Sequence, residues 1–247
     1  MEIIEIPFDK GGLGNTNGCA KAPDLLIKQK ERIKVKINNN NIAESNETIF
    51  RTIKELDEGI IIGGDHSITY SSFKAFASRN QKSGIIIFDA HPDCQDDFRP
   101  PSHEDFLRVL IEEGHVKTEN VLLVGLRKWH KIELEYLIEK NIKFITMEQI
   151  FDNGIKNVCE SIMEALTSWQ CPFYLSIDID VVDPAFAPGT GYLEAGGLSS
   201  RELLYFIGRL RQHKNFKMAD LVEINPDKDS NNLTIMLGKQ IIAALLN

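Results

Sequence analysis

The sequence is poor in cysteine and contains no C-x-x-C pair. Its four cysteines, Cys19, Cys94, Cys159 and Cys171, lie far apart along 247 residues. This spacing argues against a disulfide framework and against a zinc site built from thiolates. We therefore expect four reduced thiols with structural roles.

Long hydrophobic runs and a segregated basic patch are also missing. No apolar run approaches the roughly 18 residues that a membrane span needs. The first ten residues, MEIIEIPFDK, lack the positive and apolar regions of a signal peptide. The 28 lysines and arginines are scattered among 36 acidic residues, which gives a formal charge of −8 and disfavours nucleic acid as a partner. We expect a cytoplasmic protein that binds neither membrane nor nucleic acid.

The length and composition fit one globular domain over residues 1–247. Hydrophobic residues make up 43% of the chain and charged residues 26%, which excludes disordered and coiled-coil classes. The only low-complexity stretch, Asn38 to Asn41, predicts a surface turn. No linker rich in proline, glycine and serine divides the rest.

Short β-branched runs alternate with longer amphipathic segments, which is typical of an α/β fold with a parallel sheet covered by helices on both faces. The runs predict strands over Glu2–Pro7, Ile33–Ile37, Gly59–Gly63, Gly84–Asp89, Asn120–Gly125, Ile142–Thr146, Pro172–Asp178 and Phe216–Glu223. The segments predict helices over residues 44–57, 66–79, 102–113, 131–140, 147–167, 199–212 and 231–246.

Local signals mark helix starts and functional loops. Ser102 and Asp105 have the spacing of a capping box for the helix at 102–113, and Ser199 or Ser200 is a candidate cap for the helix at 199–212. Three long loops, over residues 9–18, 90–101 and 179–197, are expected to carry function.

Metal-binding residue types follow four of the predicted strands. Asp65 and His66 follow one strand, the segment DAHPD at 89–93 follows another, Asp178 and Asp180 a third, and Glu223 the last. All four points are carboxyl ends of strands, the edge at which ligands bind in open α/β sheets.

The spacing within these segments predicts a shared metal site. On extended backbone, side chains i, i+2 and i+4 share a face, so Asp89, His91 and Asp93 can meet at one point. Asp178 and Asp180 can do the same. An isolated Asp-x-Asp after a strand is usually a turn or a helix cap, but its occurrence together with the other segments favours a metal site.

The number and type of these ligands predict two metal ions. With His66 the group has four carboxylates and two imidazoles, which is too many for one catalytic metal but suits two ions bridged by carboxylates. Ligands that are mostly oxygen, without a thiolate, favour Mn²⁺, with Co²⁺, Fe²⁺ or Zn²⁺ as substitutes.

Three motifs in this order resemble those of the ureohydrolase (arginase/agmatinase) family: GGDHS at 63–67, DAHPD at 89–93 and SIDIDVVDPAFAPGTG at 176–191. The resemblance implies a three-layer α/β/α sandwich with a mainly parallel eight-stranded sheet, and a dinuclear Mn²⁺ centre that hydrolyses guanidino groups. It implies that one metal is held by His66, Asp89, Asp93 and Asp178, and the other by Asp89, His91, Asp178 and Asp180.

The resemblance also assigns catalytic and substrate-binding residues. His103 would shuttle a proton to the leaving amine and contact the substrate, since histidine titrates near neutral pH. Glu223, in a VEINPDKD segment similar to the family's V-E-x-N-P-x-x-D, would pair with the substrate guanidinium. The ligand Asp93 is a further catalytic candidate, and Gln95 is a candidate for substrate binding.

The segments SHEDFLRVLIEEG at 102–114 and APGTG followed by GGLSSREL resemble agmatinases more than arginases. His130 stands about where arginases carry a carboxylate. The resemblance therefore favours hydrolysis of agmatine, a small cationic guanidino compound, to putrescine and urea. Glu104 and Asp105 replace an agmatinase Gly-Thr pair, so arginase, formimidoylglutamase and another guanidino-acid hydrolase stay as alternatives.

Two interpretations of other classes remain open. One is a metal-dependent deacetylase with the same architecture, and the other is an inactive metal-binding family member or regulatory subunit. The family resemblance also implies a homo-oligomer, either a trimer or a hexamer. The roles of Trp129 and His130 are left open by the sequence.

Overall fold

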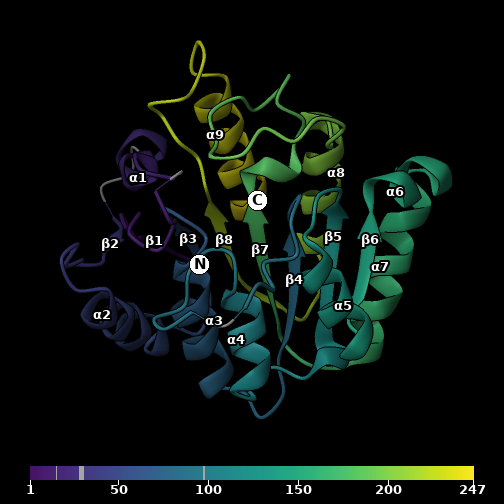
Figure 1. Ribbon diagram of the computed structural model, residues 1–247, viewed down its shortest axis with the longest axis horizontal. Coiled ribbons are helices and arrows are strands. Elements are labelled where there is room, and N and C mark those ends of the chain that lie inside the picture. The colour runs from purple at the N-terminus through teal and green to yellow at the C-terminus, as the bar shows by residue number, and fades with distance from the viewer. Residues whose placement is uncertain (15, 28–30, 97) are drawn as a thin grey trace.

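The computed structural model describes residues 1–14, 16–27, 31–96 and 98–247. Its eight strands form one sheet in which all neighbours are parallel, in the order β2-β1-β3-β8-β7-β4-β5-β6. Figure 1 shows them in this order from left to right. The strands are β1 (Glu2–Glu5), β2 (Ile33–Lys34), β3 (Gly59–Ile62), β4 (Gly84–Phe88), β5 (Val121–Leu126), β6 (Lys143–Thr146), β7 (Phe173–Asp178) and β8 (Phe216–Val222).

Helices cover both faces of the sheet, because its central strands are apolar on both sides. Every residue of β4 and β7 is buried, as parallel strands between two helical layers require. The helices are α1 (Ala22–Leu26), α2 (Ile42–Lys54), α3 (Ile68–Ser78), α4 (Phe106–Glu112), α5 (Lys131–Glu139), α6 (Met147–Asn153), α7 (Ile155–Trp169), α8 (Ser200–Arg211) and α9 (Leu233–Leu246).

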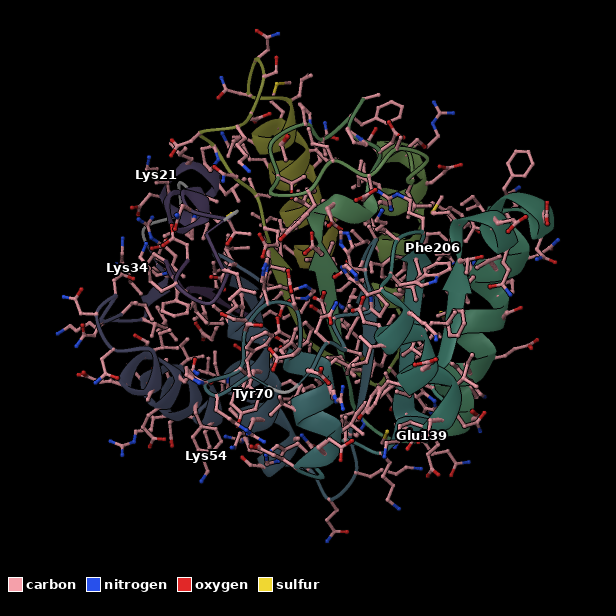
Figure 2. The ribbon with its side chains drawn as sticks, in the orientation of Figure 1. Lys21, Lys34, Lys54, Tyr70, Glu139 and Phe206 are labelled. Atoms are coloured by element: carbon pink, nitrogen blue, oxygen red, sulfur yellow. The ribbon has the colours of Figure 1, made fainter. Side chains whose placement is uncertain are left out.

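Two hydrophobic cores divide these helices into layers. Side chains of α2, α3, α4 and α5 pack in one core, and those of α1, α6, α7, α8 and α9 pack in the other. Figure 2 labels one aromatic residue from each layer, Tyr70 on α3 and Phe206 on α8. The three-layer α/β/α sandwich with an eight-stranded sheet is therefore confirmed.

Two helix predictions are wrong in detail. The single helix predicted over 147–167 is two helices, α6 and α7, because Gly154 between them has φ 79° and ends α6. The helix predicted over 102–113 begins only at Phe106, so Ser102 is not its cap. Instead, Ser102 donates its N–H and its hydroxyl to the Asp105 carboxylate in the preceding loop.

Other local predictions agree with the structure. Ser199 caps α8 by accepting the N–H of Glu202, whose carboxylate accepts the N–H of Ser199. Asn39 and Asn40 form the expected turn.

Asn15 and Asp97, within two of the predicted loops, lie outside the described residues. In the part of the chain that the structure describes, no helix has both the length and the apolar character of a membrane span.

Candidate metal centre and substrate cleft

The candidate residues gather where four neighbouring strands end. Strands β3, β8, β7 and β4 are adjacent in the sheet, and they are followed by the segments that contain His66, Glu223, Asp180 and Asp89. In Figure 1 the green loop after β7 and the yellow segment after β8 lie together at the top of the view. Segments far apart in sequence thus meet at one edge of the sheet.

His66 lies at the centre of a buried group of carboxylates. Its Nδ1 is 3.1 Å from Asp89 Oδ2, 3.1 Å from Asp93 Oδ2 and 3.2 Å from Asp178 Oδ2. The His66 and Asp89 side chains are each 1% exposed. His66 Nδ1 and Asp89 Oδ2 have no hydrogen-bond partner among the described residues. One imidazole nitrogen therefore faces three carboxylate oxygens away from water.

The hydrogen bonds behind His66 determine which ring nitrogen carries the proton and which one directs its lone pair at the carboxylates. Ser176 Oγ donates to Asp220 Oδ1 at 2.7 Å and lies 2.8 Å from His66 Nε2. Because Ser176 has one hydroxyl proton, it accepts the Nε2–H of neutral His66. Tyr174 and Thr69 donate their hydroxyls to the other oxygen of Asp220. The Nδ1 lone pair of the neutral ring is then directed at the carboxylates, as a metal ligand requires.

The carboxylates around His66 would be stabilised by a cation. Burial alone would lower the pKa of His66, but Asp178, Asp89 and Asp93 raise it well above its ordinary value. Burial raises the pKa of Asp93 to about 7, and the charge of Asp89 adds to that rise. The residues present therefore fit a divalent cation, which would offset the repulsion among these carboxylates.

A second group of ligand atoms lies next to the first and shares Asp89 with it. His91 Nδ1 is 3.0 Å from Asp180 Oδ2 and 3.5 Å from Asp89 Oδ1. The ligand atoms of Asp89, His91 and Asp180 lie close enough to one another to hold one ion. Burial opposes protonation of His91, but the charge of Asp180 raises its pKa to about 12. The two groups therefore form two adjoining candidate cation sites.

The backbone reaches this arrangement through turns, not through the extended conformation expected from the spacing. Asp93 has φ 51°, in the left-handed region. Asp180 lies in a 3-10 helix, Ile179–Val181, whose first turn is capped by the Asp178 carboxylate. Asp89, His91 and Asp93 therefore do not meet at one point: Asp89 is shared, whereas Asp93 lies in the first group and His91 in the second.

Glu223 and His103 form a pair beside the metal-ligand candidates. His103 Nδ1 is 3.3 Å from Glu223 Oε1, which also accepts the backbone N–H of His66 at 2.8 Å. Glu223 has φ 63°, also left-handed. Burial would lower the pKa of His103, but the hydrogen bond and charge of Glu223 raise it to about 9. This environment favours the protonated form of His103.

A cleft opens over these residues. His91, Asp93, Asp178, Asp180, His103 and Glu223 all line it. Gln95, Trp129 and His130, whose roles the sequence predicted or left open, are wall residues as well. Glu104 is also in the wall, where its Oε1 accepts the hydroxyl of Tyr192 at 3.3 Å.

Sequence reasoning missed several residues that shape the site. Ser176 and Asp220 support His66 from strand interiors, where no local signal distinguishes them from structural residues. Glu133, on α5, is 3% exposed and accepts the backbone N–H groups of Cys94 and His130. A charged residue on the buried face of an amphipathic helix was the available signal for Glu133.

Comparisons with known proteins agree with this geometry. A family model described as the arginase family matches residues 21–247. An arginase from Staphylococcus aureus is 36% identical over 246 residues, which cover 92% of this chain and 79% of that protein. A formimidoylglutamase from Halalkalibacterium halodurans is 32% identical over 187 residues, which cover 74% of this chain and 58% of that protein.

The fold is shared with solved structures as well. The crystal structure of arginase from Bacillus subtilis has a TM-score of 0.90 at 26% identity, with 100% of this chain and 98% of that chain covered. These matches confirm the resemblance carried by the three sequence motifs: the chain belongs to the arginase family.

Proposed function

We propose that this chain is a metal-dependent hydrolase that cleaves a C–N bond of a linear amidine or guanidino group, with agmatine as its preferred substrate. The observation that supports this most is the meeting of His66 Nδ1 with three buried carboxylates at 3.1–3.2 Å. The cleft that contains Glu223 and His103 lies over this group.

Six side chains would hold two Mn²⁺ ions. His66, Asp89, Asp93 and Asp178 would bind one ion, and Asp89, His91, Asp178 and Asp180 the other. When bound, the two ions would lower the pKa of water and so supply a nucleophile near neutral pH. The donor set of carboxylates and imidazoles without a thiolate suits Mn²⁺.

Glu223 would orient the substrate and His103 would donate a proton. A planar guanidinium matches a carboxylate through two parallel hydrogen bonds, and Glu223 lines the cleft as a buried acceptor. His103 Nε2 is buried and has no hydrogen-bond partner among the described residues. Because His103 Nδ1 is held by Glu223, Nε2 is the atom available to protonate the leaving amine.

The charge of the cleft supports a substrate with a second cationic group. Besides the metal-ligand candidates, the described lining residues include the acidic side chains of Glu104, Glu133, Glu194 and Glu223, against the basic side chains of Lys128 and His103. Agmatine presents an ammonium group to such a wall, whereas an α-carboxylate would be repelled by it. The preference for agmatine rests on this wall and on the sequence motifs, since the named relatives are an arginase and a formimidoylglutamase.

Arginine is the second candidate substrate. Lys128 could pair with its α-carboxylate, and the relative that is 36% identical is named an arginase. The test is product release with Mn²⁺ from agmatine, arginine, guanidinobutyrate and formimidoylglutamate, measured as urea or, for the last compound, formamide. Highest kcat/KM with agmatine is the expected result. A higher kcat/KM with arginine would make arginine the assigned substrate. If no compound released urea or formamide, the chain would be an inactive family member.

A further inference from the structure

All three guanidinium nitrogens of Arg127 donate hydrogen bonds to backbone carbonyls. It follows β5 directly and is half-buried. Its Nε and Nη2 donate to the Glu194 carbonyl at 3.1 and 2.8 Å, and Nη2 also donates to the Asp180 carbonyl at 2.5 Å. Its Nη1 contacts the carbonyls of Val181 and Gly125 at 3.3 and 3.4 Å.

These contacts fix both ends of the loop that follows β7. Asp180 and Val181 lie at the start of that loop, and Glu194 lies near its end, in the wall of the cleft. Only arginine has a rigid planar group with five donors that can reach several carbonyls at once. A lysine at this position would offer a single ammonium group on a flexible chain.

Arg127 also closes a ring of hydrogen bonds around the second group of metal-ligand candidates. Its backbone N–H donates to the carbonyl of Ala90, the residue between Asp89 and His91. The N–H of Ala90 donates to Asp180 Oδ1 at 3.0 Å. The Arg127 guanidinium then returns to the Asp180 carbonyl. The ends of β4, β5 and β7 are thereby held in a fixed relation at this point.

Two glycines leave room for this ring. A Cβ on Gly197 would lie 2.7 Å from Arg127 Nη2 and 2.7 Å from the Val181 carbonyl. Gly125 has φ 101°, and a Cβ there would lie 2.5 Å from Val181 Cγ2. Both glycines are needed because the end of β5 and the loop after β7 approach so closely.

We propose that Arg127 is a positioning residue for the His91 and Asp180 side of the metal centre, which it holds through the backbone of the β4 and β7 loops without contacting substrate. This rests on the metal ligands of the proposed function. Arg127 is distant in sequence from every ligand candidate, so this role is inferred from its hydrogen bonds.

The test is Mn²⁺ titration of metal-free Arg127→Lys and Arg127→Ala proteins, beside the wild type, with stoichiometry and two separate affinities as readouts. We expect two ions to bind to the wild type. In the variants, the affinity for one ion should fall by about 10–100-fold, in the range seen when groups that orient metal ligands are removed, while the other ion is retained. In urea release, kcat should fall more than KM changes.

Arg209→Lys is a matched control, because Arg209 on α8 pairs at the surface with Glu160 and contacts no ligand candidate. Thermal unfolding of the metal-free proteins separates folding from positioning. Two results would overturn the positioning role but not the two-metal proposal. One is a lower Tm together with an equal loss of both Mn²⁺ affinities, and the other is a lower Tm with both affinities unchanged. A wild-type protein that binds no second ion would overturn this role together with the two-metal proposal.

Discussion

At the scale of single residues, the two left-handed positions are the least expected feature of the site. Asp93 and Glu223 have φ values of 51° and 63°, a conformation that costs a residue with a side chain about 1–3 kcal/mol. Both are candidates for function, and both side chains are buried against other candidates. Leu13 and Gln170 also have positive φ, but only Asp93 and Glu223 among these four line the cleft.

The sequence could single out the ligand candidates because each of them lies at or just after the end of a strand, in a polar segment. The same reasoning could not find Ser176 or Asp220, because both lie inside strands, where side-chain direction depends on which strands become neighbours. Only the pairing of β7 with β8, with Ser176 opposite Asp220, places the two side chains together. Long-range pairing of this kind leaves no local pattern.

We predict that Ser176→Ala weakens Mn²⁺ binding by about 10–100-fold with little change in fold. The substitution removes the acceptor that holds His66 Nε2–H, so the ring loses the partner that orients its Nδ1. Competition titration against a metal indicator measures the effect. Ser161→Ala, at an exposed hydroxyl of α7, is the control. Equal Mn²⁺ affinity in both variants would contradict this role of Ser176.

At the scale of elements, glycine decides where helices stop. Gly154 has φ 79° and open space around it, so it separates α6 from α7 by its conformation and not by packing. The periodicity of residues 147–167 runs through this position, which explains why one helix was predicted. Gly208 has equally open surroundings, but it lies within α8, where the backbone is right-handed and helical.

The two glycines should therefore respond in opposite directions to alanine. We expect Gly154→Ala to lower the free energy of unfolding by about 1 kcal/mol or more, because alanine resists the left-handed region. Gly208→Ala should raise it by about 0.5–1 kcal/mol, because alanine favours the helix interior. Urea denaturation of the metal-free proteins measures both changes. A loss of stability at position 208 would show that α8 has less room than its surroundings indicate.

A cluster of charges links α3 to the end of α4. Glu113 accepts the Tyr70 hydroxyl at 2.7 Å and pairs with Arg99 and Lys74. Burial would raise the pKa of Glu113, but the hydrogen bonds from Tyr70 and Arg99 and the charge of Lys74 lower it to about 2. Figure 2 labels Tyr70 on this side of the molecule.

Because the folded-state pKa of Glu113 is depressed, its carboxylate stabilises the fold above its ordinary pKa of 4.5. That contribution should be lost as the pH falls from about 4.5 towards 2. We predict that Glu113→Gln lowers Tm at pH 7 and that the difference from the wild type shrinks below pH 4. Thermal unfolding across this pH range is the measurement. A difference that does not depend on pH would mean that the carboxylate charge plays no part.

At the scale of the whole molecule, part of the negative net charge of the chain comes from the carboxylates of the candidate metal centre. Two divalent ions would halve the formal charge of −8 and would remove the repulsion among four buried carboxylates. The fold class could be predicted from the alternation of strands and helices. The strand order could not, because β7 and β8 are inserted between β3 and β4, and alternation does not encode that insertion.

Chelation should therefore destabilise the protein as a whole. Ligands that bind only the folded state add about 2.7 kcal/mol at a concentration of 100 Kd, so Tm with Mn²⁺ should exceed Tm with EDTA and rise with Mn²⁺ concentration. The His91→Ala, Asp180→Asn double variant should show a smaller difference. Equal Tm values with and without chelator in the wild type would argue against structural coupling of the metal centre.

The position of β8 in the sheet bears on how the protein is made. This strand, residues 216–222, lies between β3 and β7, so a growing chain leaves two apolar strand edges unpaired until that segment leaves the ribosome. Glu223 arrives with it. A chain that ends before this segment would leave the facing edges of β3 and β7 unpaired, and such edges are prone to aggregation.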